Sequence, residues 1–558
     1  MRRIAAAGLL ATLLVACVSP LKEQPRLSRF VGTDHPFASE AVYFIVTDRF
    51  VDGDPSNNYP QQGGEWHSFD REITSPEGYK ANIGYLGGDF RGVLDHADYI
   101  AEMGFTSVWL TPVVDNPDEA FSGGVAVGEG FPADHGKTGY HGYWGVNFFA
   151  LDEHLISADL DYAGLDAGLE AKGLGLVLDV VCNHGSPSFD MPSDQPKFGE
   201  LYDASGQLVA DHQNLEPEAL VDDERLHAMY RRDRDIGQLS NLDDESPRVL
   251  EYCASATMKW LDQGADAIRI DTIKHMPDAF WAAYAARLRE SHPGLFMFAE
   301  HWSYEAKDVS RHTFPENGNI SVLDFPLQRA MSQVFGQSNQ GYEVLATPLH
   351  LNDGMYYNPY ELMSFYDNHD MSRLDADANG FIDANNWLFT ARGIPVVYYG
   401  SESAFRAGRG EHAGNRDFFG AARVEQAREH PIRRQLINIA ERRKALPALQ
   451  RGLQHNVMLE GDQAAFLRVL QHDDLSQSVL VLLNKSDADS EVRVDTGLPD
   501  VVWRADDAST VWRVSGDSIV SATVPAHGVV LLISDDPVTH GASFDALARV
   551  TATGSTDD

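Results

Sequence analysis

Short apolar runs recur along the first two thirds of the chain, and stretches with helical spacing separate several of them. The runs are near-continuous and rich in β-branched residues, which is typical of strands buried on both faces. They are Val42–Val46, Ser107–Leu110, Leu176–Val181, Ala267–Ile270, Leu295–Ala299, Ile320–Phe325, Leu362–Tyr366 and Ile394–Tyr399. The amphipathic stretches include Val93–Met103, Tyr162–Ala171, Val249–Leu261 and Ala279–Glu290. Strands that alternate with helices predict parallel βαβ units, and eight such strands predict an α/β fold with a closed (β/α)8 TIM barrel.

Polar residues follow the apolar part of several of these predicted strands. Active sites of (β/α)8 barrels lie at the C-terminal ends of the strands, so polar residues there are candidates for chemistry. They are Asp48, Asn183 and His184, Asp271, Glu300, and His369 and Asp370. Packing alone does not explain the same placement after so many strands.

The spacing of the runs predicts the domain organisation. The barrel is expected over residues 39–446, with a small inserted domain at 185–239 because about fifty residues separate the third strand from the next helix. A long glycine-rich loop runs from Pro112 to Thr138. After Leu446 the pattern changes to short alternating strands, which predicts a C-terminal antiparallel β domain at 447–535. Residues 536–558 are expected to be a flexible tail.

The N-terminus has the pattern of a targeting segment. Arg2 and Arg3 precede an apolar run that is too short to span a bilayer, so residues 1–16 are interpreted as a signal peptide. Leu14–Cys17 resembles the lipobox of bacterial lipoproteins, which implies lipidation of Cys17 and a tether at 17–38; an ordinary secretory signal is the alternative. Val18 follows the cysteine, so the expected location is the outer membrane of a Gram-negative cell, reached through the lipid anchor only.

Composition adds two restrictions. The formal net charge of −39 argues against nucleic acid or an anionic membrane surface as a partner. The hydrophobic and charged contents, 43% and 23%, are those of an ordinary globular protein. Besides Cys17 the chain has only Cys182 and Cys253, both in apolar contexts, and they are interpreted as buried thiols.

The stretch Gly264–His275 (GADAIRIDTIKH) is the strongest candidate for chemistry. Arg269 and Asp271 are two residues apart on a predicted strand, so their side chains point the same way. An arginine beside a carboxylate favours its ionised form, and an ionised, oriented carboxylate can act as a nucleophile. A structural ion pair is the alternative.

Four segments, taken together, resemble the signature regions of the α-amylase family of glycoside hydrolases. They are Asp179–His184 (DVVCNH), Gly264–His275, Phe298–Trp302 (FAEHW) and Phe365–Asp370 (FYDNHD), with Tyr140–Trp144 (YHGYW) as a further match. Within the family, the stretches VTDRFVDGDPSNN, LGGDFRG and DNHDMSR are most similar to the cyclodextrin glycosyltransferase-like branch. The resemblance covers about residues 38–535, and the extra C-terminal domains that such transferases usually carry, including the starch-binding one, are not found in it.

The resemblance implies roles for individual residues. Asp271 would be the nucleophile, Glu300 the general acid/base and Asp370 the carboxylate that stabilises the transition state, as a retaining glycosidase requires. Burial after the apolar run Leu295–Ala299 suits a raised pKa for Glu300. Substrate-binding roles are implied for Arg269, His141, Tyr143, His184, Lys274, His275, Trp302, His369 and Arg416, with Tyr143 stacking on the sugar and Arg416 on the distal non-reducing side.

The resemblance also implies bound Ca²⁺, which takes oxygen ligands from carboxylates, amides and backbone carbonyls. The first site would use Asp52, Asp54, Asn57, Asn58, Gly87 and Asp89. The second would use Asn183, Asp211 and the His275 carbonyl. A polar turn without a metal is the alternative for the first loop.

The expected activity is retaining hydrolysis of α-1,4-glucosidic bonds in starch, maltodextrins or related oligosaccharides. Alignment on Asp211 places Leu208 where cyclising relatives carry an aromatic residue, which favours hydrolysis over cyclisation unless Phe189 or Tyr202 takes that role. Two departures affect the subsites: Ser240-Asn241 replaces a pair that ends in aspartate, and His301-Trp302 replaces Trp-Phe. The alternatives are a cyclodextrin glycosyltransferase, a cyclomaltodextrinase and a silent glucan-binding lipoprotein.

Overall fold

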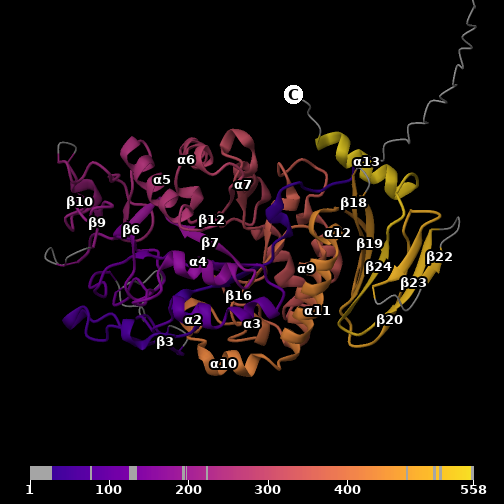
Figure 1. Ribbon diagram of the computed structural model, residues 1–558, viewed down its shortest axis with the longest axis horizontal. Coiled ribbons are helices and arrows are strands. Elements are labelled where there is room, and N and C mark those ends of the chain that lie inside the picture. Colours follow the sequence, from indigo (N-terminus) through magenta and orange to yellow (C-terminus); the bar gives the residue numbers. More distant parts are fainter. Residues whose placement is uncertain are drawn as a thin grey trace, which may run out of the picture.

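Eight parallel strands form one sheet at the centre of the molecule, and helices surround it (Figure 1). The computed structural model describes residues 28–554 except 76–77, 125–134, 192–194, 196–197, 222–223, 473–474, 507–510 and 514–517. The strands follow the spatial order β14-β13-β12-β7-β4-β1-β16-β15. They are β1 (Val42–Ile45), β4 (Ser107–Leu110), β7 (Gly175–Val180), β12 (Ala267–Ile270), β13 (Phe296–Ala299), β14 (Ser321–Val322), β15 (Met363–Ser364) and β16 (Ile394–Tyr398). Each corresponds to one predicted apolar run, so the predicted barrel is confirmed.

The two edges of this sheet meet and close the barrel. Leu323 forms a parallel bridge with Met363, and the Asp324 N–H donates to the Met363 carbonyl over 2.9 Å. β14 is shorter than the predicted run because Asp324 caps helix α8 (Phe325–Phe335) by accepting the Leu327 N–H. The Asp324 carboxylate also pairs with the buried guanidinium of Arg392.

Helices cover the outer face of the barrel. They are α1 (Thr47–Phe50), α2 (Phe90–Asp95), α3 (Ala97–Glu102), α4 (Tyr162–Glu170), α5 (Pro247–Leu261), α6 (Asp278–Ser291), α7 (Ala306–Ser310), α8, α9 (Ala378–Thr390), α10 (Gly420–Ala427), α11 (Pro431–Ala445) and α12 (Pro447–Arg451). Three of the four predicted helices agree within two residues. The fourth, Val93–Met103, is divided into α2 and α3 at His96, whose ring Nδ1 lies 2.9 Å from the Gly92 carbonyl.

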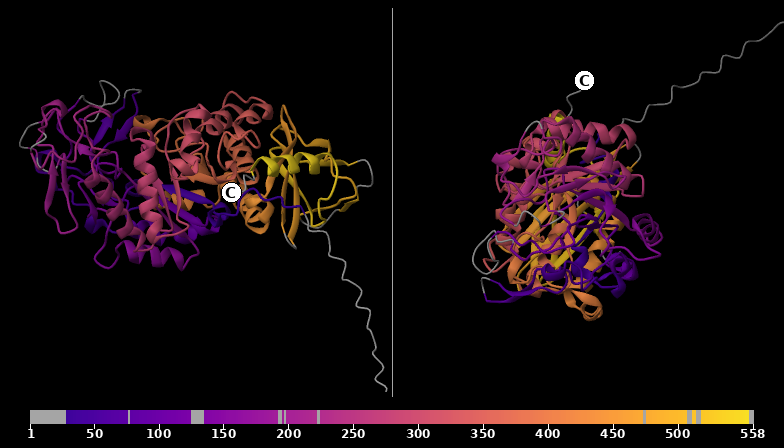
Figure 2. Two further views of the ribbon diagram at one scale, coloured as in Figure 1. Left: turned by 90° about the horizontal axis from the view of Figure 1, so that it is seen from above. Right: turned by 90° about the vertical axis from the view of Figure 1, so that its left-hand side faces the viewer.

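The segment after the third barrel strand forms two antiparallel strand pairs. β8 (His184–Pro187) pairs with β11 (Leu239–Asn241), and β9 (Glu200–Tyr202) pairs with β10 (Leu208–Asp211). The β9–β10 pair lies at the opposite end of the molecule from the C-terminal sheet (Figures 1 and 2). Smaller pairs form from β2 (Glu72–Thr74) with β3 (Lys80–Asn82) and from β5 (Val114–Asp115) with β6 (Asn147–Leu151).

The C-terminal part is an antiparallel β domain, as predicted. Its main sheet has the order β17-β18-β19-β24-β21-β22, and β20 pairs with β23. The strands are β17 (Leu453–Glu460), β18 (Gln463–His472), β19 (Leu475–Asn484), β20 (Ser490–Asp495), β21 (Val502–Ala505), β22 (Val511–Arg513), β23 (Ile519–Val524) and β24 (Gly528–Ser534). The sequence pattern predicts strands at Ala465–Leu470, Ser478–Leu483, Glu491–Val494, Val511–Val514 and Gly528–Ile533, which correspond to β18, β19, β20, β22 and β24. The other three strands are not predicted; β17 is half-buried along most of its length and shows no clear alternation.

The structure differs from the flexible tail expected at 536–558. Residues Ala542–Gly554 form helix α13, which lies against the C-terminal sheet (Figure 1). Leu547 is buried in the core of this domain, and the Ser543 hydroxyl donates to the Thr496 carbonyl over 2.7 Å. Apolar positions on one face of a helix therefore hold this segment in place.

Two buried arginines join the C-terminal domain to the barrel without a carboxylate partner. Arg468 of β18 donates to the carbonyls of Thr390 and Ala391, both over 2.7 Å. Arg443 of α11 donates to the carbonyls of Leu449 over 2.7 Å and Gly393 over 3.0 Å. Burial lowers the pKa of Arg468 to about 10 and that of Arg443 to about 9. The Arg468 contacts hold the end of α9 against the C-terminal domain, and the Arg443 contacts join α11 to the turn into β16 and to α12 at the domain junction.

The predicted signal peptide and Cys17 lie outside the described residues, so the lipid anchor stays a prediction. Within the described part of the chain, no helix combines the length and apolar character that crossing a bilayer requires.

Candidate active site

Asp271 and Glu300 occupy neighbouring positions at one end of the barrel. The β12–β13 register pairs Ile270 with Ala299, so the two carboxylates follow directly from paired residues. Backbone bonds continue past the strands, because the Asp271 N–H donates to Val180 O and the Glu300 N–H to Ile270 O, both over 2.9 Å. Thr272 then ends β12 with a positive φ of 50°, which is strained for a β-branched residue.

The Arg269 guanidinium is the common partner of three buried carboxylates. Its Nη1 lies 2.8 Å from Asp271 Oδ1 and 2.9 Å from Asp179 Oδ1, and its Nη2 contacts Glu300. The predicted Arg269–Asp271 pair is therefore present, but it is part of a larger network. Asp179 also accepts from the Trp109 indole over 3.0 Å and from the Tyr143 hydroxyl over 2.8 Å.

Burial favours the protonated form of two of these carboxylates. It raises the pKa of Glu300 well above its usual value, against the opposing effect of Arg269, and the neighbouring Asp370 and Asp271 raise this pKa further. Burial also raises the pKa of Asp179 to about 7. A proton held on Glu300 beside a carboxylate that contacts a guanidinium is the division of roles that a general acid and a nucleophile require.

Arg416, which was expected on the distal non-reducing side, lies beside the catalytic carboxylate Asp370. Its Nη2 lies 2.6 Å from Asp370 Oδ1, and its Nη1 lies 3.2 Å from Glu411. His369 Nε2 lies 3.2 Å from the other Asp370 oxygen. Burial raises the pKa of Asp370 while Arg416 lowers it and Glu411 raises it, so the balance of these two charges controls the protonation of Asp370.

The predicted sugar-binding histidines are buried and lie around the carboxylates. Burial, together with the nearby Arg416, lowers the pKa of His141 and of His369 well below its usual range, so both rings are neutral at neutral pH. Burial also lowers the pKa of His184. Nδ1 of His184 and Nδ1 of His369 are buried and have no hydrogen-bond partner among the described residues. Tyr143 stacks on His369 with ring centroids 5.4 Å apart.

Two residues with exposed aromatic rings follow Glu300 along the chain. Trp302 is 38% exposed and Tyr304 is 37% exposed, and both rings contact Phe325. The predicted Lys274 is exposed, and His275 Nδ1 lies 2.8 Å from Asp235. Trp302, Tyr304 and Lys274 thus offer ring faces and a cation to a ligand that approaches Glu300.

The first predicted metal loop contains oxygen atoms that lack partners. Oδ1 of Asp52, Asn57 and Asn58 are each buried without a hydrogen bond. A Cβ atom at Gly87, which has a φ of 91°, would lie 2.3 Å from Asn58 Oδ1 and 2.9 Å from Asp52 Oδ2. These atoms fit a hard cation.

Two further predicted ligands of this loop have other partners. Oδ1 of Asp54 accepts from the Ser56 N–H over 3.1 Å and from the Ser56 hydroxyl over 2.6 Å. Asp89 accepts the N–H groups of Gly53, Asp54 and Gly92 and caps α2. The loop therefore offers fewer unpaired oxygen atoms to a metal ion than the sequence predicts.

The second predicted metal set is only partly brought together. Asp211 pairs with Glu200 across β9–β10, and its carboxylate accepts the Gln213 N–H over 2.7 Å. Asp235 lies closer to this site: its Oδ1 is 2.8 Å from His275 Nδ1, and the nearby His275 and Asn183 lower the pKa of its carboxyl group. The Asn183 amide is fully buried and both of its polar atoms lack a standard hydrogen bond. Asp235, which the alignment of the loop did not select, therefore takes the position expected for Asp211.

Sequence reasoning missed four residues of this site: Asp179, Glu411, Asp235 and Tyr304. Asp179 could have been found, because it belongs to the motif DVVCNH and its position in the third strand pairs with Arg269 in the fourth. The other three lie in irregular loops, where spacing along the sequence does not determine which side chains meet.

Comparison with known proteins agrees with this geometry. A family model described as "Alpha amylase, catalytic domain" matches residues 44–435. The cyclomaltodextrin glucanotransferase of Klebsiella oxytoca is 27% identical over 515 residues, which cover 81% of this chain and 71% of that protein. The enzyme of the same name from Niallia circulans is 30% identical over 424 residues, covering 73% and 55%. An α-amylase of Niallia circulans is 28% identical over 417 residues, covering 72% and 74%.

Solved structures share the architecture. The crystal structure of CldA, a cyclomaltodextrin glucanotransferase with a three-domain ABC distribution, superposes with a TM-score of 0.72 and 27% identity over 88% of this chain and 99% of that one. An Anoxybacillus α-amylase superposes with a TM-score of 0.68 and 25% identity over 91% and 100%.

The charges beside Asp370 predict opposite effects of two substitutions on the pH profile. Arg416→Leu removes the cation that lowers the Asp370 pKa, so the acidic limb of kcat/KM should move up by about 1 pH unit or more. Glu411→Gln removes the anion that raises this pKa, so the limb should move down. The measurement is kcat/KM on maltoheptaose as a function of pH. Arg434→Leu, an exposed arginine paired with Glu429, is the control; shifts of the same sign in both variants would contradict the assignment.

Proposed function

Because the chain belongs to the α-amylase family and is an enzyme of that family acting on α-glucans, we propose that it hydrolyses α-1,4-glucosidic bonds of starch, maltodextrins or related oligosaccharides with retention of configuration. One observation carries the proposal: the side chains of Asp271 and Glu300 both contact the guanidinium of Arg269. Carboxyl groups this close favour a retaining mechanism, because an inverting enzyme needs room for a water molecule between them.

The roles follow from the contacts. Asp271 attacks the anomeric carbon while Glu300 donates its proton to the leaving oxygen, and Glu300 then takes a proton from the attacking water. Asp370, oriented by Arg416 and His369, stabilises the positive charge that develops on the sugar. His141, His184 and Tyr143 bind the reacting sugar, and Trp302, Tyr304 and Lys274 bind the leaving part of the chain.

Hydrolysis is preferred over cyclisation because the described residues of the inserted segment include no fully exposed aromatic ring. Among its aromatic residues, Phe189, Phe198 and Tyr230 are buried, and the hydroxyl of the half-buried Tyr202 contacts Glu200. Burial removes Phe189 as a ring around which a glucan chain could curl, and Tyr202 is only partly exposed. The aligned position Leu208 lies in β10 opposite Tyr202, but its alignment rested on Asp211 and loses weight now that Asp235 contacts Asn183 and His275.

Glycosyl transfer with cyclisation is the second candidate. It is favoured by the relatives named cyclomaltodextrin glucanotransferase and by the solved three-domain enzyme of that name, whose chain is covered almost completely. The two candidates share the glycosyl-enzyme step and differ in the acceptor, which is water in one case and the end of the same glucan chain in the other.

Removal of the nucleophile should abolish turnover without unfolding the protein. Asp271→Asn preserves shape but cannot form the glycosyl-enzyme, so kcat on maltoheptaose should fall by roughly 10⁴-fold while the melting temperature changes little. Proton NMR of the first wild-type products should show the α-anomer. An initial β-anomer would reject Asp271 as the nucleophile.

The products distinguish hydrolysis from cyclisation. Chromatography after incubation with soluble starch, maltoheptaose and β-cyclodextrin should show linear maltooligosaccharides and glucose. Asp271→Asn provides the blank for contaminating activity. Abundant cyclodextrins from starch would replace the hydrolase with a glycosyltransferase, and unchanged substrates in every case would favour a glucan-binding protein.

We also propose that the protein binds Ca²⁺ at the two predicted loops. Asp52, Asn57, Asn58 and the Gly87 carbonyl support the first site because the three side chains carry buried oxygens without partners. Asn183, Asp235 and the His275 carbonyl support the second. Bound cations would hold the first loop against the α2 N-terminus and the inserted segment against the barrel.

Metal removal should lower stability. A ligand at 100 times its Kd stabilises the folded state by about 2.7 kcal/mol, so excess chelator should lower the melting temperature measurably. Asp52→Asn should weaken this response. Asp54→Asn is the matched control, because that carboxylate contacts Ser56 and the structure does not aim it at the unpaired oxygens. Identical melting curves with and without chelator, after prolonged incubation, would count against both sites.

A further inference from the structure

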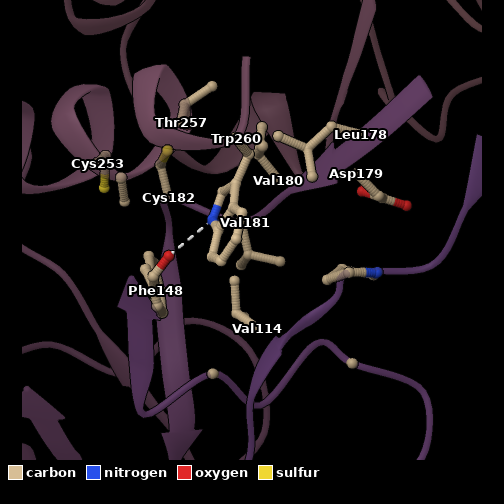
Figure 3. A pocket seen from close by; sticks show the side chains of 14 residues that line it. Val114, Phe148, Leu178, Asp179, Val180, Val181, Cys182, Cys253, Thr257 and Trp260 are labelled. Atoms are coloured by element: carbon tan, nitrogen blue, oxygen red, sulfur yellow. Dashed lines mark hydrogen bonds between the residues drawn. The ribbon is translucent and has the colours of Figure 1, made fainter. Parts of the chain in front are cut away.

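Cys182 and Cys253 lie side by side beneath the active-site end of the barrel. Cys182 follows β7 directly, and Cys253 lies in the second turn of α5, 71 positions along the chain. Both side chains are 1% exposed. Figure 3 shows their sulfur atoms on the same side of one small cavity.

The Cys182 thiol lies close enough to act on two neighbouring groups. Together with burial it raises the pKa of the Cys253 thiol and of the Tyr284 hydroxyl, which lies 2.7 Å from Thr257 Oγ1. Both cysteines border a cavity of about 20 Å³ that is lined mainly by apolar groups, among them Trp260. This free space lets the side chains change rotamer without displacing well-packed neighbours.

We propose that Cys182 and Cys253 are an oxidisable pair that forms an intramolecular disulfide when the chain folds in the presence of a disulfide oxidant. In the reaction, one cysteine thiolate attacks the oxidant disulfide and releases one thiol; the second cysteine then attacks this mixed disulfide and releases the other. The two cysteines lose two electrons and two protons in total, and the oxidant disulfide becomes two thiols.

The timing of the reaction follows from burial. Only a thiolate is reactive, and burial raises the pKa of the Cys253 thiol well above its usual value in the folded protein. Native protein should therefore exchange slowly in either direction. We expect oxidation during folding or during local opening of α5, because both thiols are then exposed to solvent.

The disulfide would act on the active site through the chain next to Cys182. Asn183 and His184 follow this residue, and His184 begins β8. A covalent bond between Cys182 and Cys253 would attach the start of this loop to α5. The side chains of Asn183 and His184 would then keep their positions at temperatures at which α5 begins to separate from the barrel. A bond that closes a loop of this length stabilises mainly by restricting the unfolded chain.

Refolding in paired redox buffers tests the proposal. Reduced full-length protein is unfolded in guanidinium chloride and refolded with reduced glutathione alone or with a mixture of reduced and oxidised glutathione. Remaining thiols are alkylated after denaturation, and the peptides are mapped by mass spectrometry. In the oxidising buffer we expect a linked Cys182–Cys253 peptide in the active fraction, a roughly tenfold loss of alkylated Cys253, and a higher melting temperature than in the reducing buffer.

Matched variants separate this pair from other cysteine chemistry. Cys17→Ser should leave the linked peptide unchanged, whereas Cys253→Ser should abolish both the link and the redox dependence of the melting temperature. If refolding yields are poor, native reduced protein is incubated with oxidised glutathione a few degrees below its melting temperature. Full alkylation of both cysteines in the folded, active protein under both conditions would overturn the proposal, as would glutathione adducts in place of the link.

Discussion

The sharing of one guanidinium by three buried carboxylates is the constraint on which this active site depends. Asp179, Asp271 and Glu300 come from three adjacent barrel strands, and Arg269 contacts all of them. One positive charge cannot balance three ionised carboxylates in a buried place, so at least one group must hold a proton. Glu300 and Asp179 meet this requirement, because burial raises the pKa of both side chains. Three carboxylates close to one guanidinium favour a proton on Glu300, which is the acid of the reaction. The strand register determines where these carboxylates lie.

The regular parts of the molecule could be predicted because their pattern is local. All eight barrel strands, and the residues that follow them, are visible in the sequence as apolar runs ending in polar groups. The errors lie where tertiary contacts decide the outcome. Arg416 turned out to contact Asp370 because a loop folds back over the barrel, and Asp235 instead of Asp211 contacts Asn183 because the inserted segment pairs β8 with β11. Helix α13 was missed because its few apolar positions indicate burial only when the sheet beneath them is known.

The two candidate reactions share every catalytic residue that the structure brings together. The choice between them depends on what approaches the glycosyl-enzyme, and hence on the loops around the site and not on the carboxylates. Trp302 and Tyr304, which follow Glu300, have exposed rings, whereas the described aromatic residues of the inserted segment are buried or half-buried. This difference is what supports the proposal of hydrolysis over cyclisation.

The junction between the barrel and the C-terminal sheet has a consequence for how the sequence can vary. Arg468 and Arg443 bind backbone carbonyls, which every amino acid carries, so residues at the end of α9 can be replaced without loss of these bonds. An insertion or deletion there would move these oxygens and remove part of the hydrogen bonding of two buried cations, although Arg468 would keep Gly452 and Arg443 would keep Leu449. Homologous proteins should therefore differ in residue identity at this junction but keep its length constant. Chimaeras that exchange C-terminal domains should fold when the length of the junction is matched, even if its sequence is not.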